Sequence, residues 1–368
     1  LHGAEEWGVE NTRYDWACGA TQLTRKHPEW GKNGFLLCNL DGNLINSDAT
    51  AIKARTSYEM VCGMQEIGDS IEGSIYPFGT NSPLWTWTES YMYAMLGIPT
   101  IESFYEGVDF WGSYHSNHDL KEVNSYSDEA FISSHVLYGT MIQKFDGLIV
   151  RPVDFTALFS KLAESLDDSI MGDTQDLRAA IKRATEAAEK LNAKSASFKV
   201  LDEDTIRFNE KVSRIFAKVT NELFGLDWYE TYDFIHARSR NNVGYLERAI
   251  EDLKKGDVEA ALDNEIRGID LNWHGYHFDK KTYDFIVGQV LGENAVATWA
   301  KGKVQSNVDL WQTGRDLWKA RKDGTKNFDG AIRTLEKALE QQKAELAESV
   351  AKEKKILCEL TEMTESCL

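Results

Sequence analysis

The sequence predicts an α/β domain followed by an all-α helical bundle. Residues 1 to about 150 alternate short apolar runs with helical patterns and carry most of the glycines, which is typical of an α/β domain. No proline follows Pro152, and long uninterrupted helices require that absence. We therefore predict two domains, over residues 1–150 and 151–368.

Several stretches after Pro152 place apolar residues at helical spacing. They are 155–166, 177–191, 206–223, 246–262 and 331–357. The pairs Asp173-Thr174 and Asp204-Thr205 precede two of these stretches and are predicted to cap the helices. The charged stretch 336–353 is predicted to be a solvated helix face.

An aromatic-rich insertion is predicted within the helical domain, at about residues 225–325. Its aromatic side chains are Trp228, Tyr229, Tyr232, Trp273, Tyr276, Trp299, Trp311 and Trp318. Aromatic residues at this density are typical either of an interface or lid, or of a core between crossing helices. His236 is predicted to be an ordinary packing or surface histidine.

Composition and charge narrow the class of protein. The chain has 368 residues, 42% of them hydrophobic and 11% aromatic, which is enough for one domain core and most of a second. A formal net charge of −18 disfavours a nucleic-acid partner, since phosphate backbones need clustered Lys and Arg. The sequence contains no run of about 18 apolar residues, so it predicts no membrane span.

The five cysteines show no paired metal-binding spacing, and an odd count is a poor disulfide framework. They favour a reducing compartment such as the cytoplasm, and localisation stays open.

The most informative motif is Gly3-Ala4-Glu5-Glu6. Two adjacent carboxylates can divide two tasks, because one can ligate a metal while the other holds a proton. Adjacent side chains on a strand point to opposite faces, so a pair that converges needs the strand to end and turn there. Gly3 and Gly8 permit that turn. On its own, a Glu-Glu pair is more often a solvated surface pair.

Two later motifs complete a set of metal donors. Asn39-Leu40-Asp41 follows an apolar run, and a buried strand that ends at an Asp presents an acid at the carboxyl edge of an α/β sheet. The stretch 114–119 then contributes a histidine, His115. Two carboxylates and an imidazole suit zinc or a related divalent ion, which makes hydrolysis the natural chemistry.

These motifs, in this order, resemble those of the co-catalytic two-zinc exopeptidase family, which includes bacterial aminopeptidases, glutamate carboxypeptidase II and the transferrin receptor. The stretch 148–155 is similar to the link that joins the peptidase domain to the helical dimerisation domain in the carboxypeptidase branch. The resemblance implies a mixed, mainly parallel sheet in the first domain, two zinc ions and a homodimer.

The resemblance also implies roles for single residues. Glu5 would be the general base, Glu6 and His115 would bind one zinc, and Asp41 would bind the other. Tyr114 would steady the oxyanion of the tetrahedral intermediate. Asp119 would orient the His115 imidazole, while His118 is the alternative ligand at this motif.

The family also needs another His and a bridging Asp ahead of the Glu-Glu strand. Here only Leu1 and His2 precede Gly3, and His2 belongs to the same strand as the carboxylate pair. We therefore expect a segment of the same precursor or a companion chain to supply these two ligands, together with the first strands of the sheet.

Glu89 is a further candidate. Family members carry an Asp ahead of the helix that ends in Gly-Ile-Pro, and Glu89 takes that place before the Gly97-Ile98-Pro99 of this chain. Its other interpretation is a helix N-terminal carboxylate, favoured by the helix dipole. The neighbouring Trp85 and Trp87 are predicted either to line a specificity pocket or to belong to the core.

Two functions follow from the sequence. The first is a zinc-dependent exopeptidase or amidohydrolase that cleaves a terminal peptide bond or an acyl-amino-acid amide bond. The second is a non-catalytic, receptor-like binding scaffold of the same fold. An aminopeptidase needs an acid for the substrate ammonium, for which Glu89 is a candidate, and a carboxypeptidase needs a basic clamp, which the sequence alone does not identify.

Overall fold

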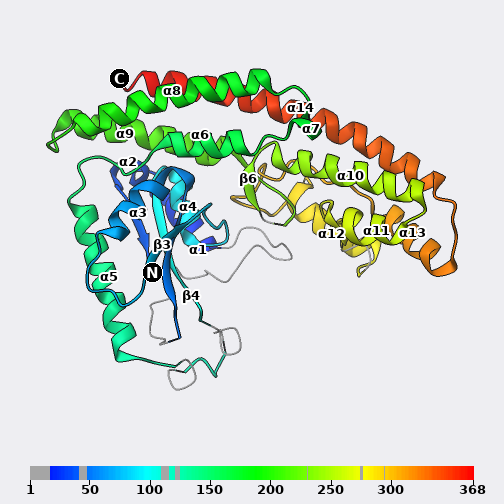
Figure 1. Ribbon diagram of the computed structural model, residues 1–368, viewed down its shortest axis with the longest axis horizontal. Coiled ribbons are helices and arrows are strands. Elements are labelled where there is room, and N and C mark those ends of the chain that lie inside the picture. Colours follow the sequence, from blue (N-terminus) through cyan, green and yellow to red (C-terminus); the bar gives the residue numbers. More distant parts are fainter. Residues whose placement is uncertain are drawn as a thin grey trace. The chain divides into compact units, whose positions relative to one another are not determined.

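The computed structural model describes residues 17–40, 48–108, 116–120, 125–229, 231–273, 277–293 and 295–368. The described chain is a mixed α/β structure that is mostly helical and contains a small mixed sheet (Figure 1). This confirms the predicted α/β class, whereas the arrangement of a peptidase domain followed by a bundle stays a prediction.

The chain divides into two compact units. The sheet unit comprises Ala20–Lys161, Arg183–Thr220 and Leu360–Leu368. The helical unit comprises Leu162–Lys182 and Asn221–Glu359, together with the described residues ahead of Ala20. The domain boundary predicted near residue 150 stays a prediction.

The sheet has four described strands, β1 (Leu37–Asn39), β2 (Ala51–Thr56), β3 (Phe78–Asn81) and β4 (Thr100–Glu106). Their order is β1-β4-β2-β3. β1 runs parallel to β4 and β2 parallel to β3, while β2 and β4 are antiparallel. β4 is therefore flanked on both sides, and its residues lie in the middle of the sheet.

One face of the sheet is apolar and carries the core of this unit. Ile52, Ala54 and Ile101 lie in one buried cluster with Met64 and Met141. The last two belong to α3 (Val61–Asp69) and α5 (Asp128–Asp146), which cover this face (Figure 1). α5 begins where the Ser127 side chain accepts a hydrogen bond from the Ala130 N–H.

The other face of the sheet is polar and is covered by α4 (Glu89–Leu96), which contacts both β1 and β4. Behind it lie the short α2 (Trp30–Asn33) and α9 (Glu203–Lys218). The buried Ser213 hydroxyl of α9 lies 2.9 Å from the Gly31 carbonyl oxygen and 2.6 Å from that of Gly97. These contacts tie α9 to α2 and to the end of α4.

A buried arginine fixes the chain just before β1. Arg151 donates hydrogen bonds to the carbonyl oxygens of Gly34, Phe35 and Asn209. Its burial lowers its pKa to about 10. The Arg151 side chain therefore fixes the residues just before β1 by binding their backbone carbonyl oxygens.

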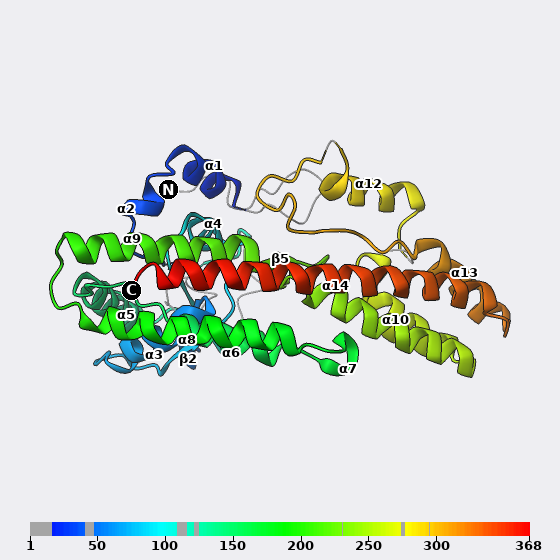
Figure 2. The same cartoon turned by 90° about the horizontal axis from the view of Figure 1, so that it is seen from above.

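The helices predicted after Pro152 are confirmed, with shifted ends. They are α6 (Phe155–Glu164), α8 (Gln175–Ser197), α9, α10 (Ala237–Lys255) and α14 (Asp329–Glu365), and α8 and α14 run beside each other in Figure 2. Asp173 accepts a hydrogen bond from the Gln175 N–H at the start of α8, as predicted.

Two details of that prediction were wrong. The cap of α9 is Asp202, which accepts from the Thr205 N–H, so Asp204-Thr205 already lies inside the helix. The stretch 246–262 is not one helix. α10 ends at Lys255, and the Gly256 that caps it has a left-handed φ of 83°. α11 (Val258–Ala260) and a π-helical turn (Ala261–Glu265) follow.

The helical unit also contains α7 (Asp168–Met171), the hairpin of β5 (Phe224–Leu226) and β6 (Tyr232–Phe234), α12 (Lys280–Leu291) and α13 (Trp311–Asp323). Its aromatic residues divide between core and surface. Trp228, Tyr232 and Trp299 are buried, whereas Tyr229 and Trp318 are exposed by 40% and 45%. The core interpretation is therefore confirmed for the buried residues, whereas an interface or lid formed by the exposed ones stays a prediction.

No helix among the described residues is long and apolar enough to cross a membrane.

Candidate functional site

The predicted metal ligands and catalytic residues lie outside the part of the chain that the structure describes. These are Glu5, Glu6, Asp41, Tyr114 and His115. Their roles therefore stay predictions. The structure does describe Glu89, Asp119 and the strand β1, which ends two residues before Asp41.

A row of polar residues crosses the sheet at the end of β1. Asn39 of β1 pairs with Glu102 of β4, Glu102 pairs with Arg55 of β2, and Arg55 pairs with Asn81 of β3. Directly opposed residues project from the same face of a sheet, so the row lies on the face that α4 covers. We call Asn39, Glu102, Arg55 and Asn81 the polar row.

Glu89, the first residue of α4, lies against this row. Only 6% of Glu89 is exposed, and its Oε2 lies 3.5 Å from Nδ2 of Asn39, which donates to it. The predicted stand-in residue is thus brought to the strand end that leads into Asp41. This contact joins two motifs that lie 50 residues apart.

Thr88 fastens the start of α4 to the middle of the sheet. Its backbone has the extended conformation of an N-cap, but its side chain makes no capping hydrogen bond. The Thr88 hydroxyl instead donates to Glu102 Oε2, at 2.7 Å. Glu102 is 3% exposed, and a hydrogen bond to a buried carboxylate is among the stronger ones.

Arg55 is held tightly within the row. Its guanidinium lies 4.1 Å from the ring centroid of Trp85 and 5.3 Å from that of Phe104. It also donates to the Pro83 carbonyl oxygen, at 2.9 Å. Burial lowers the pKa of Arg55, and the charge of Glu102 opposes that shift. Arg55 therefore clamps the segment between β3 and α4.

The two tryptophans stack on each other, with centroids 4.9 Å apart, and Trp87 is 44% exposed. Tyr91 and Tyr93 of α4, by contrast, are buried. The exposed end of this stack is Trp87.

Among the described residues, the buried polar atoms without a hydrogen-bond partner include Arg55 Nε, Ser90 Oγ and Thr100 Oγ1. Thr100 lies two residues before Glu102 on β4 and so shares its face. A buried polar atom left without a partner costs about 1–3 kcal/mol, and such atoms call for a specific explanation.

Asp119 lies in an exposed turn, where its N–H donates to the Ser116 carbonyl oxygen at 3.2 Å. Its predicted partner, His115, lies outside the described residues, so the orienting role stays a prediction.

Within the described residues, no group of three or more His, Cys, Asp or Glu side chains is placed to hold a metal ion. The donor set expected for zinc, Glu6, Asp41 and His115, is chemically suited to it. The described structure contributes a half-buried, polar strand end two residues before Asp41 in the chain.

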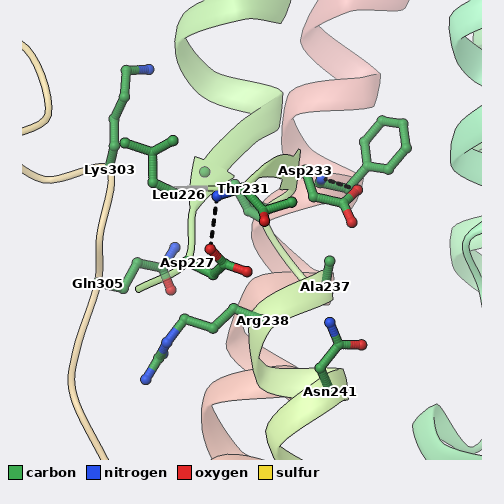
Figure 3. A pocket seen from close by; sticks show the side chains of 12 residues that line it. Leu226, Asp227, Thr231, Asp233, Ala237, Arg238, Asn241, Lys303 and Gln305 are labelled. Carbon is green, nitrogen blue, oxygen red and sulfur yellow. Dashed lines mark hydrogen bonds between the residues drawn. The ribbon is translucent and has the colours of Figure 1, made fainter. Parts of the chain in front are cut away.

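Two of the hollows in the described part of the helical unit were not predicted from the sequence. A small cavity of about 40 Å³ lies beside the β5–β6 hairpin and the start of α10 (Figure 3). Its Arg238 is bound by both carboxylate oxygens of Asp270 and by Glu345, and Lys303 extends away from Asp227. The cavity has room for a few water molecules only. The second hollow, of about 350 Å³, is open and lies beside Tyr229, Arg267 and Trp273.

A buried histidine pair also belongs to the helical unit. His236 Nδ1 lies 2.8 Å from Glu353 Oε1, and both side chains are fully buried. His236 Nε2 lies 3.4 Å from the hydroxyl oxygen of Ser165. Ser165, His236 and Glu353 thus lie in the order of a hydrolase triad. However, Ser165 donates its proton to the Leu162 carbonyl, and the imidazole is closed to solvent. The contact is structural, and the prediction of an ordinary packing histidine is confirmed.

Comparison of the sequence with models of protein families and with curated protein sequences finds no match.

Proposed function

We propose that the protein is a zinc-dependent exopeptidase or amidohydrolase that cleaves a terminal peptide bond or an acyl-amino-acid amide bond. The proposal is supported by the ordered motifs around Glu5, Asp41 and His115, and by the polar strand end next to Asp41. The Asn39–Glu89 contact carries most weight, because it joins two separate motifs at one edge of the sheet.

In this proposal Glu6 and His115 would hold one zinc ion and Asp41 would hold the other. The metal would acidify a water molecule and polarise the scissile carbonyl. Glu5 accepts the proton of the attacking water, so its carboxylate must lie within about 3 Å of that water. Tyr114 donates a hydrogen bond to the oxyanion, and Asp119 orients the His115 ring.

The family that the chain resembles also needs a further His and a bridging Asp as metal ligands. Tests therefore use the protein purified from its native host, so that whatever supplies these ligands stays with it. Such a protein would also be a homodimer formed through its helical region.

The deciding experiment combines metal analysis with an assay of hydrolysis. Glu5→Gln should lower turnover by a factor of at least 100 while the zinc content is unchanged, because the base is lost and the ligands remain. Glu10→Gln is the matched control and should keep the activity. Wild-type activity in Glu5→Gln would show that the base is another residue.

The second candidate is a non-catalytic, receptor-like scaffold of the same fold. It predicts a protein without bound divalent metal and without hydrolytic activity. Metal analysis therefore separates the two functions before any substrate is known.

A further inference from the structure

We infer that the open hollow beside Tyr229, Arg267 and Trp273 binds a small aromatic carboxylate. The Arg267 guanidinium holds the carboxylate, and the two aromatic side chains contact the ring of the ligand. The hollow lies within the helical unit. Binding there requires neither zinc nor hydrolysis, so it goes beyond the proposed function. We call this site the Arg267 hollow.

The size and lining of the Arg267 hollow suit a small ring compound. Its volume of about 350 Å³ lies at the lower end of the range of about 300–1,000 Å³ that small-molecule sites occupy. Such sites are lined mainly by apolar and aromatic side chains with a few polar groups. Here Tyr229 and Trp273 supply two rings, and Tyr229 is 40% exposed, so that a ligand can reach its ring.

The charges around the hollow favour an anion. Asp263, which also lines it, lies 2.8 Å from a guanidinium nitrogen of Arg321, and Glu265 lies 2.8 Å from one of Arg248. Both acids are thus already paired. The Arg267 guanidinium, by contrast, forms no ion pair and no hydrogen bond within the described residues. The hollow therefore presents one positive charge without a partner, in a chain whose net charge is −18.

A carboxylate fits this charge better than a phosphate does. A guanidinium can bind either group through two parallel hydrogen bonds. A carboxylate carries a single negative charge, which Arg267 balances. A phosphate monoester carries about −1.5 to −2 charges near neutral pH, and the excess would face the Asp263 carboxylate in the same hollow.

Two hydrogen-bonded walls of the hollow are joined before any ligand binds. The Tyr229 hydroxyl donates to the Arg267 carbonyl oxygen, at 2.6 Å. Burial raises the pKa of Tyr229, and the charge of Arg267 opposes that shift, which means that the guanidinium lies near the Tyr229 hydroxyl. A prearranged site loses less conformational freedom when a ligand binds.

The backbone of the hollow is irregular, and its packing is tight. Asp263 belongs to the π-helical turn Ala261–Glu265, and Arg267 to the following 3-10 turn, Ile266–Gly268. π-helical turns are frequent at functional sites. At Gly268 an added Cβ would lie 2.7 Å from the Tyr245 ring, so the backbone of this turn packs directly against that ring.

Calorimetry on the full protein with three probes tests the inference. Indole-3-acetate has both the ring and the carboxylate, indole-3-acetamide has the same ring without the charge, and acetate has the charge without the ring. Wild-type protein should bind indole-3-acetate at least 10-fold more tightly than either of the other two. This comparison needs no variant.

Two variants then locate the site. Arg267→Gln should lower the affinity for indole-3-acetate at least 10-fold, because the cation is lost. Arg333→Gln, which changes an exposed arginine of α14 outside the hollow, is the matched control and should bind like the wild type. Trp273→Leu should also weaken binding, and circular dichroism shows whether each variant is folded.

Absence of indole-3-acetate binding by the wild type, or equal binding of indole-3-acetamide, would overturn the inference. So would unchanged affinity in a folded Arg267→Gln variant. Tighter binding of adenosine monophosphate than of indole-3-acetate, lost in Arg267→Gln, would replace the carboxylate by a phosphate and refute the class of ligand inferred here. None of these results depends on zinc content or hydrolysis, so the proposed function and the Arg267 hollow fail or stand separately.

Discussion

The Thr88 hydroxyl donates a 2.7 Å hydrogen bond to the buried carboxylate of Glu102, which fastens the residue before α4 to the central strand β4. Thr88→Val should therefore lower the free energy of unfolding by about 1–3 kcal/mol, because Glu102 loses a donor in a buried site. Thr88→Ser keeps the hydroxyl and should lose much less. Urea unfolding of the three proteins measures the difference, and equal losses in both variants would show that the hydroxyl is not responsible.

Glu59 should make stability depend on pH. Burial raises its pKa from 4.5 to about 7, because the charged carboxylate is disfavoured inside the protein. Between these pH values the folded chain holds a proton that the unfolded chain has lost. The free energy of unfolding should therefore fall as pH rises through this window, by roughly 3 kcal/mol at most.

Glu59→Gln should remove that slope, since the amide does not titrate. Urea unfolding between pH 4 and about pH 8 measures it. Glu72→Gln, at an exposed position, is the control and should keep the wild-type slope. A Glu59→Gln variant with the wild-type slope would assign the slope to other groups.

His236 and Glu353 should be energetically coupled, because their side chains bond to each other in a fully buried site. A double-mutant cycle with His236→Ala and Glu353→Ala should give a coupling energy of about 1–3 kcal/mol. The double variant should then be more stable than the two single losses predict. Additive losses in chemical unfolding would mean that the observed hydrogen bond contributes little.

Two glycines should respond to alanine in opposite directions. Gly97 ends α4 with a φ of 98°, and an added Cβ would lie 2.9 Å from the Ser213 carbonyl oxygen. Gly97→Ala should therefore destabilise the protein, by about 1–3 kcal/mol. Gly139 lies within α5 with open space around it, so Gly139→Ala should stabilise by about 0.5–1 kcal/mol. Thermal unfolding of both variants checks the pair, and a stabilised Gly97→Ala variant would contradict the left-handed end of α4.

Local patterns in the sequence were enough to predict the helices after Pro152. Apolar spacing is a property of neighbouring residues, so the sequence shows it directly. The helix ends were less certain, because Asp202 and Asp204 are equally good caps and only the backbone geometry selects Asp202. The break at Gly256 was missed for a similar reason, since apolar spacing continues on both sides of it.

The candidate site was predicted only in part. Glu89 and the strand before Asp41 were identified from their order along the chain. Glu102, Arg55 and Thr88 were missed, because no local motif marks them and their partners come from other strands. Glu353 was wrongly assigned to a solvated helix face, since its charge gave no sign that His236 lies against it.

By itself, therefore, the sequence determined the α/β class, the helical character of the second half and the order of the acidic and imidazole motifs. Each of these features depends on residues that are close together in the chain or on their order along it. Only the tertiary structure decided that Asn39, Glu102, Arg55 and Asn81 stand in one row beside Glu89. The physical reason is that strand register and the side chains packed against it depend on contacts between residues far apart in the chain, and no local spacing encodes them.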